Sequence, residues 1–301
     1  MTESALDSAG AVDLSGRTVG FLGFGLMGRP MAARLVAAGA EVIGWTRSGA
    51  LPSTVTAAAT PLAVARRADR LILMLADTPA VEAVVFGPEG VAGGLSHGSL
   101  VIDMGTTAVA ATRGFAQRLA ALGASWVDAP VSGGTVAAEA GTLTIMAGGA
   151  PEALAAARPF FQAMGRRITD VGSVGAGQVA KTCNQLIVGL TIAAVSEALA
   201  LARAAGVDPA LVRDAIRGGF AESRILDLHG QRMIERSFTP GGKVTTQVKD
   251  LVQAEALASA SRIDLPVLSA VRARFDALVE VGGGALDHSA LYTLFDPPAH
   301  Q

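Results

Sequence analysis

Cysteine is almost absent from the chain, and a recognisable leader segment is absent too. The single cysteine, Cys183, cannot form an internal disulfide, and disulfides are typical of proteins from oxidising compartments. The opening residues MTESALDSAGAVDLSG lack the basic and apolar stretches of a secretory signal. These absences favour a reducing, cytoplasmic setting. Residues 1–15 are small and polar without apolar periodicity, and we expect them to form a flexible tail.

Aromatic and charged residues are few. They make up 4% and 17% of the chain, whereas hydrophobic residues make up 50%. This composition excludes a disordered chain and predicts aliphatic, alanine-rich cores, and 301 residues are enough for two domains. The formal net charge of -2 gives no electrostatic reason for a polyanionic partner, so we expect no nucleic acid to bind.

Long hydrophobic runs are missing as well. The most apolar stretch, residues 186–195, is closed by Ser196 and Glu197 after about ten residues, whereas a helix that crosses a bilayer needs about 20. We interpret this stretch as a buried core helix and expect no membrane association. Its hydrophobicity exceeds what the core of one monomer needs, which favours a homo-oligomer, either a dimer or a tetramer.

Short apolar runs and helical segments alternate from residue 16 onwards. The runs typical of buried strands are TVGFLGFG, EVIGWT, DRLILMLA, SLVIDMG and ASWVDAP, and a further pair of strand signals, TLTIMAG and RRITDVG, flanks the helix-like PEALAAARPFFQAMG. This alternation predicts an α/β fold whose N-terminal domain, residues 16–177, is a Rossmann-type doubly wound parallel sheet. Strand signals stop after Gly177, which predicts a long helix over about residues 178–205 within an all-helical domain, residues 178–301.

A glycine-rich loop, Gly23-x-Gly25-x-x-Gly28, follows the first apolar run and opens a helical pattern. Gly23 would make the tight turn, Gly25 would let the backbone approach a pyrophosphate, and Gly28 would allow close packing of helix against strand. Because this loop is the first strand-to-helix turn of an α/β pattern, it predicts a dinucleotide site rather than an ordinary glycine turn. Leu26 and Met27 lie within the loop and belong to the expected site.

The residues at the end of the second predicted strand indicate which dinucleotide binds, NADP(H) or NAD(H). An acidic residue there would bind a ribose 2′-hydroxyl, but the sequence reads Trp45-Thr46-Arg47-Ser48. A guanidinium flanked by two hydroxyls suits a 2′-phosphate, so we expect NADP(H) to be preferred over NAD(H). The alternative is a solvated loop arginine. We also place Leu75 and Ala76, which end the run 69–76, among the cofactor-binding residues.

Lysine is rare, with three residues among the 24 of the Lys+Arg total. Because the chain uses arginine at most positively charged positions, we expect lysine at positions where arginine cannot do the chemistry. The amine of lysine can donate a proton and take it back, whereas the guanidinium of arginine stays charged. Lys181 enters the most apolar run, and Asn184 and Gln185 follow at i+3 and i+4 on the same helix face. We therefore interpret Lys181 as a candidate acid/base, the alternative being a lysine at a helix end whose charge reaches water.

A second polar cluster, Ser132-Gly133-Gly134, follows a predicted strand. Two glycines after a serine allow backbone N–H groups to converge on an anion, with the hydroxyl as a further donor. By itself the motif is an ordinary turn. At the carboxyl end of a strand in an open α/β sheet it lies where substrates bind.

Four segments together resemble the motifs of the β-hydroxyacid dehydrogenase family, and the likeness spans residues 17–295. They are GFGLMGRPMA, DAPVSGGTVAAEAGTL, GAGQVAKTCNQ and VKDL. The resemblance implies that Lys181 is the catalytic acid/base and that Asn184 orients the substrate. It also implies that Ser132, Gly133 and Gly134 hold the substrate carboxylate, and that Thr106 and Lys249 lie against the cofactor.

The reaction that the resemblance implies is hydride transfer between NADP(H) and a short 3-hydroxy or 3-oxo acid. The segments IRGGFAESRILDLHGQRM and GGGALDHSALY resemble the branch of the family that reduces tartronate semialdehyde to glycerate. Two departures from the family pattern, Gly242 and the segment Thr246-Gln247-Val248, leave the size of the substrate open. The alternatives are a 3-hydroxyisobutyrate-type or larger substrate, an imine reductase, and a catalytically silent NADP-binding module. We expect no metal site, because the four histidines show no ligand spacing.

Overall fold

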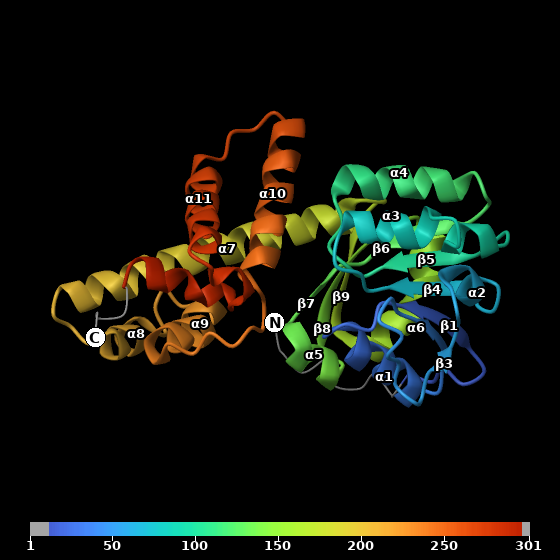
Figure 1. Cartoon of the computed structure of the whole chain (residues 1–301), viewed down its shortest axis with the longest axis horizontal. Coiled ribbons are helices and arrows are strands. Elements are labelled where there is room, and N and C mark those ends of the chain that lie inside the picture. The colour runs from blue at the N-terminus through green and yellow to red at the C-terminus, as the bar shows by residue number, and fades with distance from the viewer. Residues whose placement is uncertain (1–11, 297–301) are drawn as a thin grey trace, which may run out of the picture. The chain divides into compact units, whose positions relative to one another are not determined.

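The computed structural model describes residues 12–296 and divides the chain into two compact units (Figure 1). The first unit extends to Lys181 and the second begins at Thr182, a few residues beyond the boundary expected at residue 177. The long helix α7 (Ala176–Ala204) contributes to both units and matches the helix expected over about 178–205. The two units are described separately below.

The first unit contains one nine-stranded sheet. Its strand order is β3-β2-β1-β4-β5-β6-β8-β7, with β9 paired to β8. The strands are β1 (Thr18–Leu22), β2 (Glu41–Trp45), β3 (Thr56–Ala57), β4 (Arg70–Leu73), β5 (Leu100–Asp103), β6 (Ser125–Asp128), β7 (Val131–Ser132), β8 (Leu143–Gly148) and β9 (Gly165–Gly172).

Two strands of this sheet, β8 and β9, run opposite to the others. All pairs from β3 to β6 are parallel, which confirms the predicted doubly wound sheet. Strand β8 is antiparallel to β6 and β7, and it is parallel to β9. Each of the seven apolar runs forms a strand, whereas the two-residue strands β3 and β7 were not predicted.

Helices cover both faces of this sheet (Figure 1). They are α1 (Gly28–Ala37), α2 (Pro61–Ala65), α3 (Thr78–Phe86), α4 (Val109–Ala120), α5 (Gly134–Ala140) and α6 (Pro151–Met164), with a short 3₁₀ turn, η2 (Val91–Gly94). Successive strand residues face opposite sides. Phe21 therefore packs into the apolar cluster under α1 and α6, and Leu22 packs into the one under α3 and α4.

The start of the described chain packs against this unit. Leu14 is fully buried in the same cluster as Phe21, and its amide donates to Ala38 O at 2.7 Å. Leu14 falls within the segment expected to be a flexible tail, so that expectation does not describe residues 12–15. Residues 1–11 of the expected tail lie outside the described residues.

The second unit is helical, as predicted. After α7 it contains α8 (Pro209–Ile216), α9 (Arg224–Glu235), α10 (Val244–Ala260) and α11 (Pro266–Glu280), followed by the 3₁₀ turns η3 (Gly283–Ala285) and η4 (His288–Leu294). Its core gathers residues such as Ile192, Leu251, Phe275 and Tyr292, all fully buried. The side chains of Asp208 and Ser223 accept amides at the starts of α8 and α9, which is how helices of this kind satisfy their first N–H groups.

One helix of the described chain, α7, is long and apolar enough to cross a membrane by length and composition. It has 29 residues and a window of mean hydropathy 1.8, so it extends well beyond the ten-residue run considered in the sequence. A single helix of this kind is weak evidence for a span, because core helices of soluble proteins have the same composition. Ile192 and Leu199 of α7 pack in the core of the second unit.

Candidate active site at the carboxyl ends of the parallel strands

The first unit gathers most of the expected site residues along one edge of its sheet. Strands β1, β2, β4, β5 and β6 are parallel, so their carboxyl ends meet at the same edge. The connections that leave this edge carry the expected residues Gly23, Gly25, Leu26, Met27, Gly28, Thr46, Arg47, Ser48, Leu75, Ala76, Thr106, Ser132, Gly133 and Gly134.

The glycine loop has a different reason for each glycine. Gly23 has a φ of +102°, and a Cβ there would lie 2.3 Å from Met74 O. A Cβ on Gly28, the first residue of α1, would lie 1.9 Å from Gly23 O. Around Gly25 a Cβ would meet nothing within 4 Å. The fold therefore needs Gly23 and Gly28, whereas the open space at Gly25 fits the close approach of a ligand such as a dinucleotide pyrophosphate.

The turn after β2 is exposed and contains Arg47 and Ser48. Within this turn the amide of Gly49 donates a hydrogen bond to Thr46 O at 3.0 Å. A second arginine reaches the same segment, because Arg29 on α1 donates to Ala50 O at 2.7 Å. Sequence reasoning missed Arg29; the signal would have been its place directly after the last glycine of the loop.

The connections after β4 and β5 contact each other. A Cβ on Gly105 would lie 2.7 Å from Leu75 O, which leaves no room for any other residue there. Leu75 and Ala76 lead into α3, whose first turn is capped by Asp77 through a 2.9 Å bond from the Ala80 amide. Thr106 follows Gly105 and is half-buried. The neighbour of Thr106 in the chain, Gly105, thus lies against Leu75, and a cofactor role for Thr106, Leu75 and Ala76 stays a prediction.

The segment Ser132-Gly133-Gly134 follows β6 and joins β7 to α5. Ser132 is half-buried, both glycines are exposed, and both have a positive φ, +129° at Gly133 and +67° at Gly134. Around Gly134 a Cβ would meet nothing within 4 Å. The backbone therefore presents an open, glycine-lined surface beside a serine hydroxyl, which suits a carboxylate.

Lys181 lies beside this segment. Its side chain is 8% exposed, and Nζ donates to Val131 O at 2.8 Å. Val131 precedes Ser132 in β7, so the ammonium and the serine connection come together in the first unit. This contact shows that Lys181 does not extend into solvent, which disfavours the alternative of a solvated helix-end lysine.

Asn184 and Lys249 lie in the second unit, where a chain of polar contacts includes both. Asn184 Nδ2 donates to Gln185 Oε1 at 2.8 Å, and Gln185 Nε2 donates to Asp250 Oδ2 at 2.6 Å. Lys249 Nζ lies 3.2 Å from Asp250 Oδ1. Gln185 and the buried Asp250 thus support these two residues, and sequence reasoning gave Asp250 no role.

Both departures from the family pattern have close neighbours in the second unit. A Cβ on Gly242 would lie 3.3 Å from His288 Cε1, so the imidazole borders the space that a bulkier residue would need. Gln247 is 1% exposed and donates to Gln185 O at 3.0 Å. A Cβ on Gly189 would lie 2.8 Å from Gln247 Nε2. Gln247 therefore fixes α10 against a side-chain-free position of α7.

Comparisons with known proteins cover almost the whole chain. Residues 18–172 match the family model described as the NAD binding domain of 6-phosphogluconate dehydrogenase. Residues 175–295 match the one described as the NAD-binding region of NADP-dependent 3-hydroxyisobutyrate dehydrogenase. The 2-hydroxy-3-oxopropionate reductase of Escherichia coli K12 is 42% identical over 277 residues, which cover 91% of this chain and 95% of that protein. The chain belongs to the β-hydroxyacid dehydrogenase family.

Other members of the family are similar along their full lengths. The 3-hydroxyisobutyrate dehydrogenase of Pseudomonas aeruginosa is 34% identical over 296 residues, covering 92% of this chain and 98% of that protein. The structure of Mycobacterium tuberculosis 3-hydroxyisobutyrate dehydrogenase with L-serine superposes with a TM-score of 0.84 at 30% identity. It covers 92% of this chain and 98% of that one. The protein is thus an NAD(P)-dependent β-hydroxyacid dehydrogenase that acts on a small molecule.

Two histidines of the dehydrogenase meet in its second unit although they are far apart in the sequence. His288 Nε2 lies 3.2 Å from His229 Nε2, and His229 Nδ1 lies 3.7 Å from the carboxylate of Asp287. Residues of this kind can hold a metal. Asp287, however, also accepts Arg232 at 2.8 Å and Ser289 Oγ at 2.7 Å. Burial lowers the pKa of His288 from 6.5 to about 4 and also lowers the pKa of His229. His300 lies outside the described residues.

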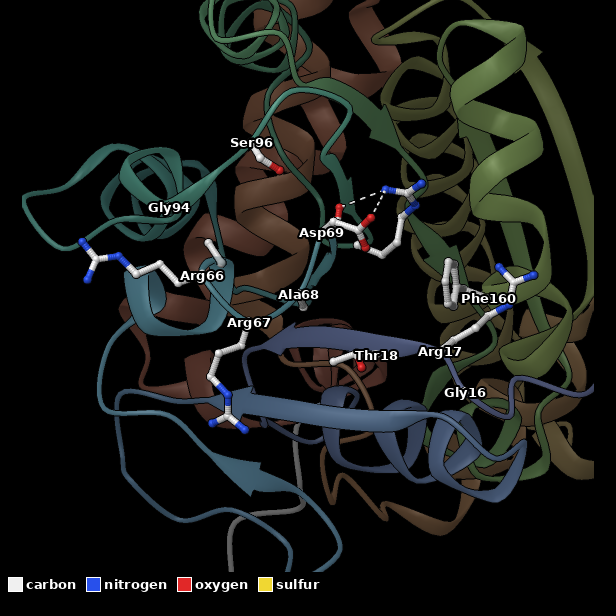
Figure 2. A pocket seen from close by; sticks show the side chains of 12 residues that line it. Gly16, Arg17, Thr18, Arg66, Arg67, Ala68, Asp69, Gly94, Ser96 and Phe160 are labelled. Atoms are coloured by element: carbon white, nitrogen blue, oxygen red, sulfur yellow. Dashed lines mark hydrogen bonds and ion pairs between the residues drawn. The ribbon is translucent and has the colours of Figure 1, made fainter.

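A hollow of about 600 Å³ lies at the amino ends of the strands of the dehydrogenase, away from the expected site (Figure 2). Thr18 and Arg70, the first residues of β1 and β4, are among the residues that line it. In Figure 2 the side chains of Arg17, Arg66 and Arg67 point in different directions. Arg70 is already paired with Asp69 at 3.0 Å. Because these guanidinium groups do not converge, the hollow does not resemble an anion site.

Proposed function

We propose that this dehydrogenase reduces tartronate semialdehyde to glycerate with NADPH as the preferred hydride donor. The observation that supports the chemistry best is the buried ammonium of Lys181, 2.8 Å from Val131 O and next to Ser132 along the strand. A proton donor and a carboxylate-binding segment side by side are what a 3-oxo acid requires. The relative that shares 42% identity is named for this reaction, which supports the choice of substrate.

In this proposal the chain's own residues bind the acid and deliver one proton. Ser132 Oγ and the backbone amides of Gly133 and Gly134 hold the substrate carboxylate, so that its carbonyl faces Lys181. The ammonium of Lys181 gives its proton to the carbonyl oxygen as negative charge develops there, and the amine takes the proton back in the reverse direction. Asn184 orients the substrate. The bound dinucleotide supplies the hydride, and the residues of the glycine loop fit it through the open space at Gly25.

The preference for NADPH is supported by the turn after β2. Arg47 and Ser48 are exposed there, no carboxylate lies in the sequence Trp45-Thr46-Arg47-Ser48, and Arg29 donates to the carbonyl of Ala50, two residues after Ser48. Two guanidinium groups suit a dianionic 2′-phosphate better than a hydroxyl. We expect kcat/KM to favour NADPH over NADH by at least about tenfold, roughly 1.4 kcal/mol. Equal efficiency with both cofactors would contradict this part of the proposal.

The substrate is tested by NADPH oxidation across a panel of semialdehydes. Tartronate semialdehyde has a hydroxyl where methylmalonate semialdehyde has a methyl, and a site that bonds the hydroxyl leaves polar groups unpaired when the methyl binds. Tartronate semialdehyde should show the highest kcat/KM, and the panel should include longer acids because Gly242 departs from the family pattern. A higher kcat/KM for methylmalonate semialdehyde would move the protein to the 3-hydroxyisobutyrate-type alternative, which the 34% identical relative represents.

Two further alternatives are tested by the same assay. An imine reductase would oxidise NADPH with cyclic imines and not with semialdehydes, and a catalytically silent module would bind NADPH without turnover. The presence of both Lys181 and Asn184 supports the dehydrogenase over either one.

We also propose that the protein is a cytoplasmic homo-oligomer. Its single cysteine supports the location. Large apolar side chains of the second unit remain exposed, among them Ile187 at 64%, Leu201 at 70% and Phe220. A second copy that covers them would remove this surface from water. Light scattering coupled to size-exclusion chromatography would show a dimer or tetramer, and a monomer at micromolar concentration would contradict the proposal.

A further inference from the structure

Asp128 is a buried carboxylate to which the sequence gave no role. It ends β6, is fully buried, and accepts two amides from the start of α7: Gly175 N at 2.7 Å and Gln178 N at 2.8 Å. A helix leaves its first N–H groups without partners, and a negative charge at that end is stabilised by the helix dipole. Asp128 therefore anchors the end of α7 that carries Lys181.

Two glycines, Gly148 and Gly177, border the carboxylate of Asp128. A Cβ on Gly148 would lie 3.0 Å from Asp128 Oδ1, and a Cβ on Gly177 would lie 2.9 Å from Oδ2. Side chains at these two positions would push α7 away from β6. The close approach of the helix to the strand thus depends on two missing side chains and on one carboxylate between them.

Lys181 follows one turn after Gln178 and contacts the same connection. Its Nζ donates to Val131 O, three residues after Asp128. The segment 128–131 therefore holds α7 twice, through the carboxylate at its first turn and through the ammonium at its second. If the first contact is lost, the helix can shift, and the position of Nζ relative to Ser132 shifts with it.

The side chain of Gln178 connects the same helix turn to the loop that carries Thr106. Gln178 is fully buried; its Nε2 donates to Gly105 O at 2.9 Å and its Oε1 accepts Thr107 N at 3.1 Å. The carboxylate of Asp103 also holds this loop, because it accepts hydrogen bonds from Thr107 Oγ1 at 2.6 Å and from Gly105 N at 3.1 Å. The start of α7 is thus fixed to the loop after β5 as well as to the one after β6.

We propose that Asp128 and Gln178 are positioning residues that set the place of Lys181 between the cofactor loop at Thr106 and the substrate segment at Ser132. Neither residue needs to touch the reacting atoms. This inference rests on the proposed role of Lys181 as the proton donor. Misplacement of a catalytic group by about 1 Å through a distant change costs about a hundredfold in rate, which sets the expected effect.

The test is a double-mutant cycle with Lys181→Ala and Asp128→Asn. Asparagine keeps the shape of aspartate, but its amide nitrogen cannot accept the second backbone N–H. With tartronate semialdehyde and NADPH, Asp128→Asn should lower kcat by about a hundredfold. In the Lys181→Ala background the same substitution should cause no further loss of kcat. The side chain that Asp128 positions is absent from this background.

The control is Asp208→Asn, which removes an exposed cap whose carboxylate accepts Ala210 N at 2.9 Å at the start of α8, outside the site. It should leave kcat unchanged. Wild-type kcat in Asp128→Asn would overturn the inference, and so would an equal loss of rate with and without Lys181. Undiminished turnover of Lys181→Ala would instead overturn the proposed function.

Gln178→Leu covers the case in which Asp128→Asn does not fold. Leucine fills the buried space but makes neither bond to the loop 105–107, and the same cycle with Lys181→Ala applies to it. Thermal unfolding and NADPH titration show which variants are folded. If neither variant folds, the inference is overturned, since the pair would then hold the whole unit together rather than set the place of one side chain.

Discussion

The three glycines of the first loop differ in what surrounds them, and this difference predicts that alanine substitutions separate folding from cofactor binding. At Gly25 a Cβ would meet nothing within 4 Å, and Gly25 is not among the glycines with a positive φ. The fold should therefore accept Gly25→Ala with a change in the free energy of unfolding within about 0.5 kcal/mol. The methyl group would occupy the space expected for the pyrophosphate, so NADPH affinity should fall at least tenfold, or about 1.4 kcal/mol.

The substitution Gly28→Ala should instead lower the free energy of unfolding. Its Cβ would lie 1.9 Å from Gly23 O, whereas real Cβ atoms essentially never come closer than 3.0 Å to such an atom. Both the loop and the first turn of α1 would have to move by about 1 Å. Overpacking of this kind costs about 1–3 kcal/mol and can cost more, and we expect at least the upper end because the obstacle is backbone.

Urea unfolding and NADPH fluorescence titration of the same preparations measure the two effects. Gly114→Ala is the matched control, since Gly114 lies inside α4, where a Cβ would also meet nothing within 4 Å. This control should gain about 0.5–1 kcal/mol of stability from helix propensity and bind NADPH normally. The reasoning fails if Gly25→Ala binds NADPH as tightly as the wild type, because the open space would then have no ligand.

Three further substitutions test other contacts. Lys181→Arg keeps the positive charge and should keep NADPH affinity, but kcat should fall by several orders of magnitude because arginine cannot cycle a proton; more than about a tenth of the wild-type rate would show that charge alone suffices. Gly189→Ala would bring a Cβ to 2.8 Å from Nε2 of the buried Gln247 and should destabilise the second unit by about 1–3 kcal/mol in urea, whereas no change would mean that the side chain of Gln247 moves aside. His288 is held neutral by burial, with its pKa lowered from 6.5 to about 4, so the unfolded chain binds its proton first and stability is lost as pH falls through this window. His288→Gln should remove up to about 3 kcal/mol of that pH dependence in unfolding measured at pH 4 and pH 7, and an unchanged dependence would contradict the assignment.

Most of the sheet could be predicted because its central strands, such as β4 and β5, are buried on both faces. Residues 71–73 and 100–102 are continuous apolar runs between helical segments, and such runs read as strands of a covered parallel sheet. The direction of β8 could not be predicted, since an apolar run looks the same whether its neighbour is parallel or antiparallel. The two-residue strands β3 and β7 were missed because two residues are too few for any periodicity.

The candidate site was predictable where its residues are close in the sequence. The glycine spacing predicted separate roles for Gly23, Gly25 and Gly28; close backbone contacts explain the absence of side chains at Gly23 and Gly28, and the role of Gly25 toward a pyrophosphate stays a prediction. Contacts between distant segments could not be foreseen. Gln178 bonds to a residue 73 positions earlier, and Arg29 reaches a carbonyl 21 positions later. Their residue types are compatible with any exposed helix position, so only the folded chain shows these contacts.

Three ionisable residues show that the effect of burial on a pKa depends on the contacts in the folded chain. Burial raises the pKa of Asp128 to about 6, although the amides of Gly175 and Gln178 work against it, and burial lowers the pKa of His288 to about 4. The same loss of water disfavours the charged form of both, so the shifts have opposite directions. Burial also pushes the pKa of Asp287 upwards, yet the hydrogen bond from Ser289 Oγ and its other partners lower it to about 2. Asp128 and Asp287 are the same residue type and equally hidden from solvent. Asp287 has a side-chain donor, Ser289 Oγ, and a charged partner, Arg232, whereas Asp128 accepts backbone amides, and these partners come from segments that only the fold brings together.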